Sequence, residues 1–232
     1  ITLIERFHGL AEAVNPAAWI TLEDLFSFGK AAAAVGDVRG IATINVQHGI
    51  VGAYPYRTGV DVVGTFAAFG EASRDTLIER GADPERIVIT GPVRYDDIHH
   101  VASNRADLLR GAGCDVDRPV VLFASQPTRR LITQGVKRSA LRGLLAAAKA
   151  HDAQIVIKTH PLEDETALNA LLDELCGDQP RPIIVRGGLY DWLMACDVMA
   201  TISSTVVYEA AVAQKPALLL EFTGNSDVAG YV

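Results

Sequence analysis

The chain has 232 residues, enough for one large or two small domains, and its 49% hydrophobic and 21% charged composition is that of an ordinary globular protein. A net charge of −7 without a basic stripe argues against a nucleic-acid partner. No apolar run is long enough to span a bilayer. The three cysteines, Cys114, Cys176 and Cys196, have neither metal-ligand nor disulfide spacing, so we expect a reducing, cytoplasmic compartment.

Short apolar strands alternate with helices through the first part of the chain. Asn15 and Pro16 end the first predicted helix, and Gly81 ends the third. The pattern predicts helices at about 3–14, 25–35 and 71–80, and strands at 17–22, 41–46, 62–68 and 86–90. This block is short for a complete domain, so we expect an incomplete first domain and a chain that is part of a longer protein.

The same alternation resumes after a polar connection. Strands are predicted at 119–124, 154–159, 182–186, 197–202 and 217–221, and helices at 139–151, 165–176, 189–195 and 205–213. Apolar strands that alternate with helices of this length predict an α/β protein whose parallel sheets are covered on both faces. We therefore expect two Rossmann-like domains, at residues 1–95 and 118–232, joined by a connection at 96–117.

The segment 201–210 combines the end of an apolar strand, small hydroxyl residues and the start of a helix. Free N–H groups in the first turn of a helix attract anions, and the hydroxyls of Ser203, Ser204 and Thr205 could add donors. Glu209, one turn later, is placed to meet ribose hydroxyls, so the segment suits a nucleotide. The same residues also fit a Ser/Thr N-cap with Glu209 as the distal half of a capping interaction.

Polar residues also follow other predicted strands of the second block. Ser125 and Gln126 follow one strand, where they either touch phosphate or satisfy loop amides. Lys158 and His160 flank the end of the next strand. They either neutralise a diphosphate or are a surface lysine and a histidine that caps the turn before Pro161. Ligands of open parallel sheets bind outside the carboxyl ends of the strands, so this convergence on one rim predicts a ligand site there.

His48 follows the predicted strand 41–46. Histidine is the residue type that most often acts as a general base, although a ring that bonds to nearby backbone fits the sequence as well. His99 and His100 are adjacent to each other but lack further ligands at metal-binding spacing, so we expect no metal site.

Several of these motifs resemble proteins of the GT-B fold. Residues 87–92 are similar to the end of their first domain, and residues 157–161, Asp197, 203–205, 209–210 and 215–216 are similar to their nucleotide-binding domain. One branch comprises the capsule and teichoic-acid type transferases, such as CDP-glycerol glycerophosphotransferases. They carry His-Gly and Lys-x-His-Pro motifs, which His48-Gly49 and 158–161 match.

The other branch is UDP-N-acetylglucosamine 2-epimerase, which shares the Thr-Gly end of a strand and the Glu-Ala helix. Its acidic, arginine-bearing loop is not evident at residues 47–58, so the transferase branch is favoured.

The resemblance implies a transferase of bacterial surface polysaccharide biosynthesis. It would move a sugar or polyol-phosphate unit from a nucleotide-activated donor to a carbohydrate or lipid-linked acceptor. His48 would be the base in the acceptor-side domain. Lys158, His160 and residues 203–205, with Ser125 and Gln126, would hold the phosphates, and Glu209 would hold the ribose in the nucleotide-binding domain.

No metal or other cofactor is implied beyond the donor itself. A lipid-linked acceptor would bring the protein into peripheral contact with the inner face of the membrane. Two alternatives stay open. One is a UDP-N-acetylglucosamine 2-epimerase-like isomerase of sugar nucleotides, and the other is a non-catalytic module that binds a nucleotide sugar.

Overall fold

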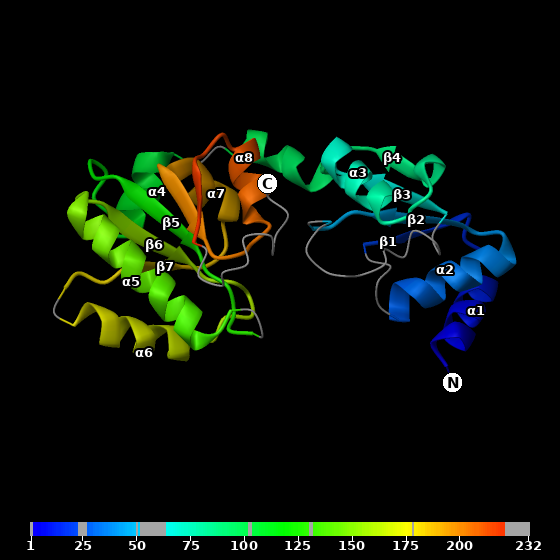
Figure 1. Ribbon diagram of the computed structural model, residues 1–232, viewed down its shortest axis with the longest axis horizontal. Coiled ribbons are helices and arrows are strands. Elements are labelled where there is room, and N and C mark those ends of the chain that lie inside the picture. Colours follow the sequence, from blue (N-terminus) through cyan, green and yellow to red (C-terminus); the bar gives the residue numbers. More distant parts are fainter. Residues whose placement is uncertain are drawn as a thin grey trace. The chain divides into compact units, whose positions relative to one another are not determined.

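The computed structural model describes residues 2–22, 27–49, 51, 64–101, 104–129, 132–177 and 179–220, and the structural statements below concern these residues. They form two compact units (Figure 1). The first unit extends to Arg94 and the second begins at Tyr95. Each unit is an α/β structure built on its own sheet.

The first unit carries a parallel four-stranded sheet in the order β1-β2-β3-β4. Its elements are α1 (Leu3–Val14), β1 (Ala18–Thr21), α2 (Ser27–Arg39), β2 (Ala42–Val46), β3 (Thr65–Ala68), α3 (Glu71–Glu79), the 3-10 turn η2 (Pro84–Arg86) and β4 (Ile87–Ile89). The first helix begins at a capping box in which Thr2 and Glu5 satisfy each other's backbone N–H groups. It ends at Asn15, whose left-handed backbone precedes a proline, as the sequence predicts.

Helices α2 and α3 pack on one face of this sheet. A Cβ on Gly36 of α2 would touch Trp19 and Thr43 of the sheet. Leu77 of α3 packs with Phe66, which pairs with Asn45 of β2, and Asn45 points to the same face as Thr43. Ile20, which alternates to the opposite face, is 71% exposed. Ala67 points to that same face from β3 and is only 7% exposed, so this face is open at the edge strand and buried at the centre of the sheet.

The second unit carries a parallel five-stranded sheet in the order β7-β6-β5-β8-β9. Its elements are η3 (Val93–His100, which starts in the first unit), α4 (Arg105–Gly111), β5 (Val120–Ala124), α5 (Gln134–Ala150), β6 (Gln154–Lys158), α6 (Glu165–Cys176), β7 (Ile183–Val185), α7 (Leu189–Ala195), β8 (Val198–Thr201), α8 (Val206–Val212) and β9 (Ala217–Leu219).

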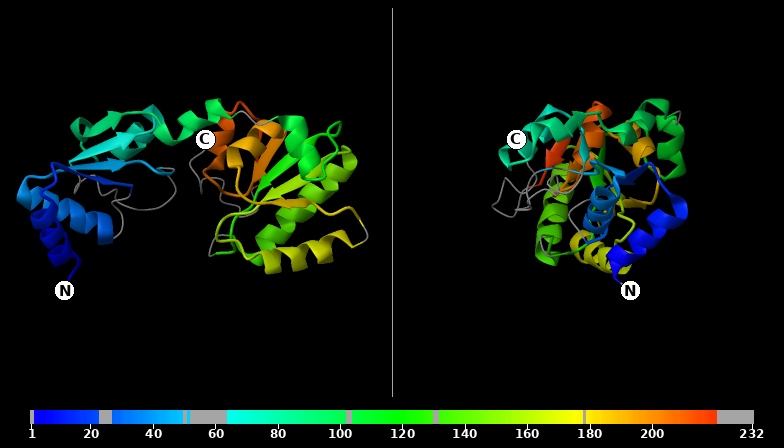
Figure 2. Two further views of the ribbon diagram at one scale, coloured as in Figure 1. Left: turned by 180° about the vertical axis from the view of Figure 1, so that it is seen from behind. Right: turned by 90° about the vertical axis from the view of Figure 1, so that its right-hand side faces the viewer.

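The main core of the second unit lies between its sheet and helices α5 and α6. Phe123 and Ile157 point from β5 and β6 toward Leu141 and Leu168 of these helices, and all four are fully or almost fully buried. Helix α7 packs against the sheet at β5, and Figure 2 shows it across the sheet from α5 and α6. This sheet is covered on both faces, as predicted.

Two helices differ from the expectation. Helix α5 starts at Gln134 and not at residue 139, because the Thr133 side chain accepts the Val136 N–H and caps it earlier. The expected connection at 96–117 contains α4, which Asn104 caps in the same way. Leu109 is its single fully buried side chain, too little periodicity for the sequence to reveal the helix.

Candidate functional site

The strand order of the second unit reverses its direction at one point of the sheet. From β5 the chain proceeds to β6 and β7 on one side, and from β8 to β9 on the other. Such a reversal of direction is a topological switch point, and ligands of open α/β sheets bind there, outside the carboxyl ends of the strands. Ser125 and Gln126 follow β5, whereas Ser203 and Ser204 follow β8, so the fold brings these four predicted residues to the switch point.

Gln126 ties the two sides of the switch point together. Its Oε1 accepts the Ser203 N–H at 2.8 Å, and its Nε2 donates to the Ser203 carbonyl. The Thr201 hydroxyl, at the end of β8, donates to the Ala124 carbonyl of β5 at 3.0 Å. The Gln126 amide is thus engaged with the neighbouring loop. This arrangement corresponds to the alternative in which Gln126 satisfies loop amides, and it gives Gln126 a positioning role.

Ser125 offers a buried hydroxyl at the same place. The residue is 5% exposed, and its Oγ has no hydrogen-bond partner among the described residues. Its backbone N–H donates to the Lys158 carbonyl at 3.0 Å, which holds the backbone of Ser125 beside the end of β6. Because a buried polar group without a partner is unfavourable, a ligand oxygen that met this hydroxyl would gain a strong interaction.

The turn into α8 shows part of the capping arrangement that the sequence left open. The Ser204 hydroxyl accepts the Val206 N–H at 3.3 Å, which is a capping contact, whereas Thr205 makes no side-chain cap. Ser203 is half-buried beside Gln126. Glu209 lies within the first turns of α8 and is 1% exposed, an unusual burial for a carboxylate that polar partners must compensate.

Lys158 and His160 lie at the adjacent strand end. Lys158 is half-buried, its Nζ donates to the Thr159 carbonyl at 3.0 Å, and burial lowers the pKa of its ammonium group. The exposed His160 ring accepts the Leu162 N–H on Nδ1 at 3.0 Å. His160 therefore caps the turn at Pro161, the alternative that the sequence left open, and its Nε2 carries the proton when the ring is neutral.

His48 lies in the first unit, just beyond β2. It is exposed, and its carbonyl accepts a hydrogen bond from Arg94 Nη1 at 2.9 Å. Its ring makes no hydrogen bond within the described part of the chain, so the backbone, and not the imidazole, is held. Of the residues that follow, residue 50 and residues 52–63 lie outside the described part of the chain.

Gln47, which was not among the predicted site residues, organises the loop that carries His48. Its buried side chain donates to the Gly49 carbonyl at 2.8 Å and to the Ser73 hydroxyl at 3.0 Å, and accepts the Phe69 N–H at 2.7 Å. Gln47 thereby joins the ends of β2 and β3 to helix α3. The available signal was a long amide side chain directly after an apolar strand.

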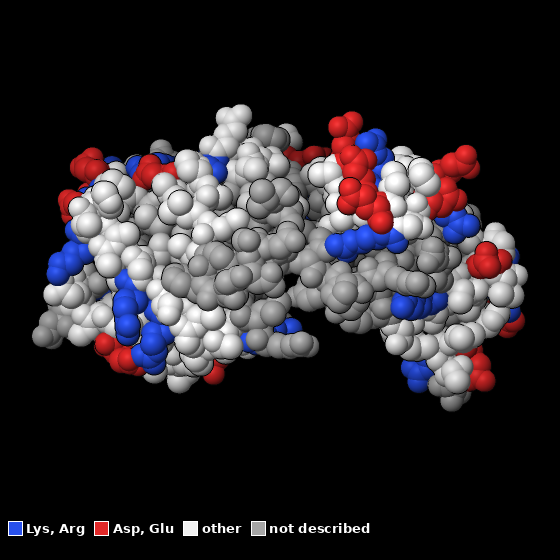
Figure 3. Space-filling model, in the orientation of Figure 1, with Lys and Arg blue, Asp and Glu red and all other residues white. Residues whose placement is uncertain are grey.

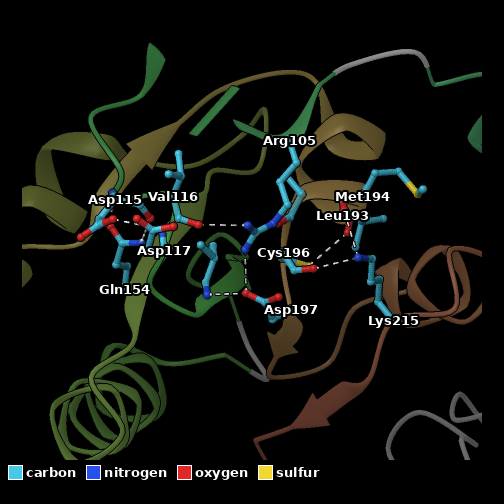
Figure 4. Close-up of polar contacts among 12 residues, drawn as sticks. Arg105, Asp115, Val116, Asp117, Gln154, Leu193, Met194, Cys196, Asp197 and Lys215 are labelled. Atoms are coloured by element: carbon cyan, nitrogen blue, oxygen red, sulfur yellow. Dashed lines mark hydrogen bonds and ion pairs between the residues drawn. The ribbon is translucent and has the colours of Figure 1, made fainter. Parts of the chain in front are cut away.

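The motif residues Asp197 and Lys215 lie near the opposite, amino ends of the strands of the second unit (Figure 4). One Asp197 oxygen accepts from the Val120 N–H at 2.8 Å and from Arg105 at 3.0 Å. Lys215 donates to the carbonyls of Met194 and Cys196, both at 2.9 Å. These contacts hold α4, α7 and the strands together, so we assign these residues a structural role.

Charge and helix length add little about partners. On the face that Figure 3 shows, acidic and basic side chains of the described residues are interspersed. No group of three or more His, Cys, Asp or Glu side chains in the described ranges is arranged to hold a metal ion. None of the described helices is both long and apolar enough to cross a membrane.

No family model and no curated protein sequence matches the chain. Solved structures do resemble it. MnaA of S. aureus, in a structure with UDP, has a TM-score of 0.73 and 14% identity over 95% of this chain and 61% of that chain. UDP-GlcNAc 2-epimerase of Neisseria meningitidis, bound to UDP-GlcNAc, has a TM-score of 0.73 and 15% identity over 95% of this chain and 64% of that chain.

A third structure, Anabaena HepE in complex with UDP-glucose, has a TM-score of 0.54 and 17% identity over 81% of this chain and 55% of that chain. The chain thus spans less than two thirds of the length of these proteins. At such identities the likeness bears on the fold alone. Together with the two parallel sheets, it shows that the chain has a GT-B-like fold of two α/β units, as predicted.

Proposed function

We propose that the chain binds a nucleoside diphosphate sugar at the switch point of its second unit. The observation that carries this proposal is the convergence of Ser125, Lys158 and Ser203 on the carboxyl ends of neighbouring strands, with the Ser125 hydroxyl buried and lacking a partner among the described residues. Hydroxyl, ammonium and backbone N–H donors are the groups that stabilise a diphosphate. The likeness to structures that contain UDP or UDP-GlcNAc supports the same ligand class.

We assign the diphosphate to Ser125, Lys158 and the turn 203–205, and the ribose to Glu209. Gln126 positions the turn through both polar atoms of its amide. His160, whose Nδ1 is engaged in its own turn, has only Nε2 to offer to a phosphate. The expected loss for a Ser125→Ala variant is about 1.4 kcal/mol, which is about a tenfold increase in the Kd of UDP.

Titration calorimetry with UDP tests this site. Ser139→Ala is the matched control, because Ser139 is exposed on α5 of the same unit. The wild type and Ser139→Ala should bind UDP equally, and Ser125→Ala should bind it about tenfold more weakly. Equal affinity of all three proteins would show that the diphosphate does not meet Ser125. No binding to the wild type would refute the nucleotide proposal.

For the reaction, we favour a sugar-nucleotide epimerase over the transferase that the motifs first indicated. Several of the similar solved structures are UDP-GlcNAc 2-epimerases, which supports the isomerase alternative better. Epimerisation needs no acceptor, so UDP-GlcNAc alone should be converted to an epimeric sugar nucleotide. Proton NMR of the sugar ring, followed over time with the full chain, measures this conversion directly.

A transferase is the second candidate, and His48 favours it. Its exposed imidazole at the carboxyl end of β2 suits a base that takes the proton of an acceptor hydroxyl. This reaction predicts that the nucleotide sugar is consumed only when an acceptor is added, and that His48→Ala abolishes turnover while UDP still binds. Binding without turnover under either condition would instead identify a non-catalytic module.

A further inference from the structure

A cavity of about 190 Å³ lies in the second unit, at the amino-terminal ends of α5 and α6. Four segments line it: the loop after β5, the first turn of α5, the loop that leads into α6, and the first turn of α6. The residues that matter for its chemistry are Pro127, Thr128, Gln134, Lys137, Leu162 and Glu163. They are distinct from the residues assigned above to the nucleotide.

The cavity contains a buried ion pair. The Lys137 ammonium contacts Glu163 Oε1, and their side chains are only 3% and 2% exposed. Removing two charges from water is costly, and such a pair is tolerated only when the remaining polar atoms are hydrogen-bonded. Glu163 Oε2 is buried and has no hydrogen-bond partner within the described ranges. This carboxylate oxygen is therefore available for a donor inside the cavity.

The other lining groups define what kind of donor fits. Asp164 also lines the cavity, so two carboxylates accompany the single ammonium group of Lys137, and an anion such as phosphate is disfavoured. The Thr128 hydroxyl and the Gln134 amide can both donate and accept. Leu162 and Pro127 supply apolar surface. A mixture of donors, acceptors and apolar surface matches a molecule with several hydroxyl groups on a carbon skeleton.

We propose that this cavity is a binding site for a small neutral polyhydroxylated molecule, between glycerol and a monosaccharide in size, with one ligand hydroxyl donating to Glu163 Oε2. The site goes beyond the proposed nucleotide function and does not depend on it.

Saturation-transfer difference NMR with glycerol and with N-acetylglucosamine tests the proposal on the full chain. The wild type should give a saturable signal with at least one of the two probes. In the double variant Lys137→Met/Glu163→Gln, which removes both charges without leaving one buried, the affinity should fall about tenfold. The matched control is Arg138→Met/Glu174→Gln, which removes an exposed ion pair between α5 and α6 of the same unit and should bind like the wild type.

Ala167→Leu provides a second test that leaves all charges in place. Ala167 lines the cavity from α6, so a leucine should fill the space and abolish the signal while the helix is kept. UDP affinity, measured on the same proteins, should not change. A wild type that gives no saturable signal with either probe, or a signal that survives in Ala167→Leu, would overturn the site. Neither outcome would bear on the nucleotide site.

Discussion

Gln126→Met tests whether one amide holds the switch point together. Methionine has a similar length but no amide group, so the variant loses the hydrogen bonds to the N–H and to the carbonyl of Ser203. At about 1 kcal/mol for each bond, the free energy of unfolding of the second unit should fall by about 2 kcal/mol. With a typical urea m-value of about 2 kcal/mol/M, the midpoint should move down by about 1 M.

The two tryptophans allow this unit to be followed alone. Trp19 lies in the first unit and Trp192 in the second, so a Trp19→Phe background leaves fluorescence that reports only the second unit. Gln179→Met, at an exposed position of the same unit, is the control and should change stability by less than about 0.5 kcal/mol. If Gln126→Met unfolds at the same urea concentration as this control, the hydrogen bonds between Gln126 and Ser203 contribute nothing to the stability of the second unit.

Three further predictions concern single residues. Gln47→Ala removes three hydrogen bonds and should destabilise the first unit by about 3 kcal/mol in urea unfolding followed through Trp19; no change would mean that water replaces them. Gly188→Ala should lower the free energy of unfolding by about 1–2 kcal/mol, because φ is +53° there and the new Cβ would lie 3.1 Å from an Asp191 oxygen. Gly143→Ala, at an exposed position of α5, should instead stabilise the protein. Burial lowers the pKa of Lys158, and a diphosphate favours its charged form, so UDP affinity should fall as the pH rises through that lowered pKa. Calorimetry of Lys158→Gln should not show this fall. A pH profile identical to that of the wild type would mean that Lys158 does not contact the diphosphate.

Local sequence patterns were sufficient for most elements of the second unit. The helices Glu165–Cys176 and Leu189–Ala195 were predicted to the residue, because apolar periodicity defines both, and a glycine follows the first and precedes the second. The polar residues at the ends of β5, β6 and β8 were also found in advance, since they interrupt apolar runs. Helix α4 was missed because it contributes one buried leucine and otherwise looks like a polar loop.

These local patterns do not predict strand order, because strand order depends on pairing between segments that are far apart in the chain. Only the placement of β5 beside β8 brings Gln126 to Ser203, 77 residues away, and leaves the Ser125 hydroxyl buried at the same point. The buried pair of Lys137 and Glu163 arises in the same way, because it joins α5 to the loop that leads into α6. The sequence alone therefore determined which residues stand at the strand ends, whereas tertiary packing decided which of them meet and which carry structural contacts.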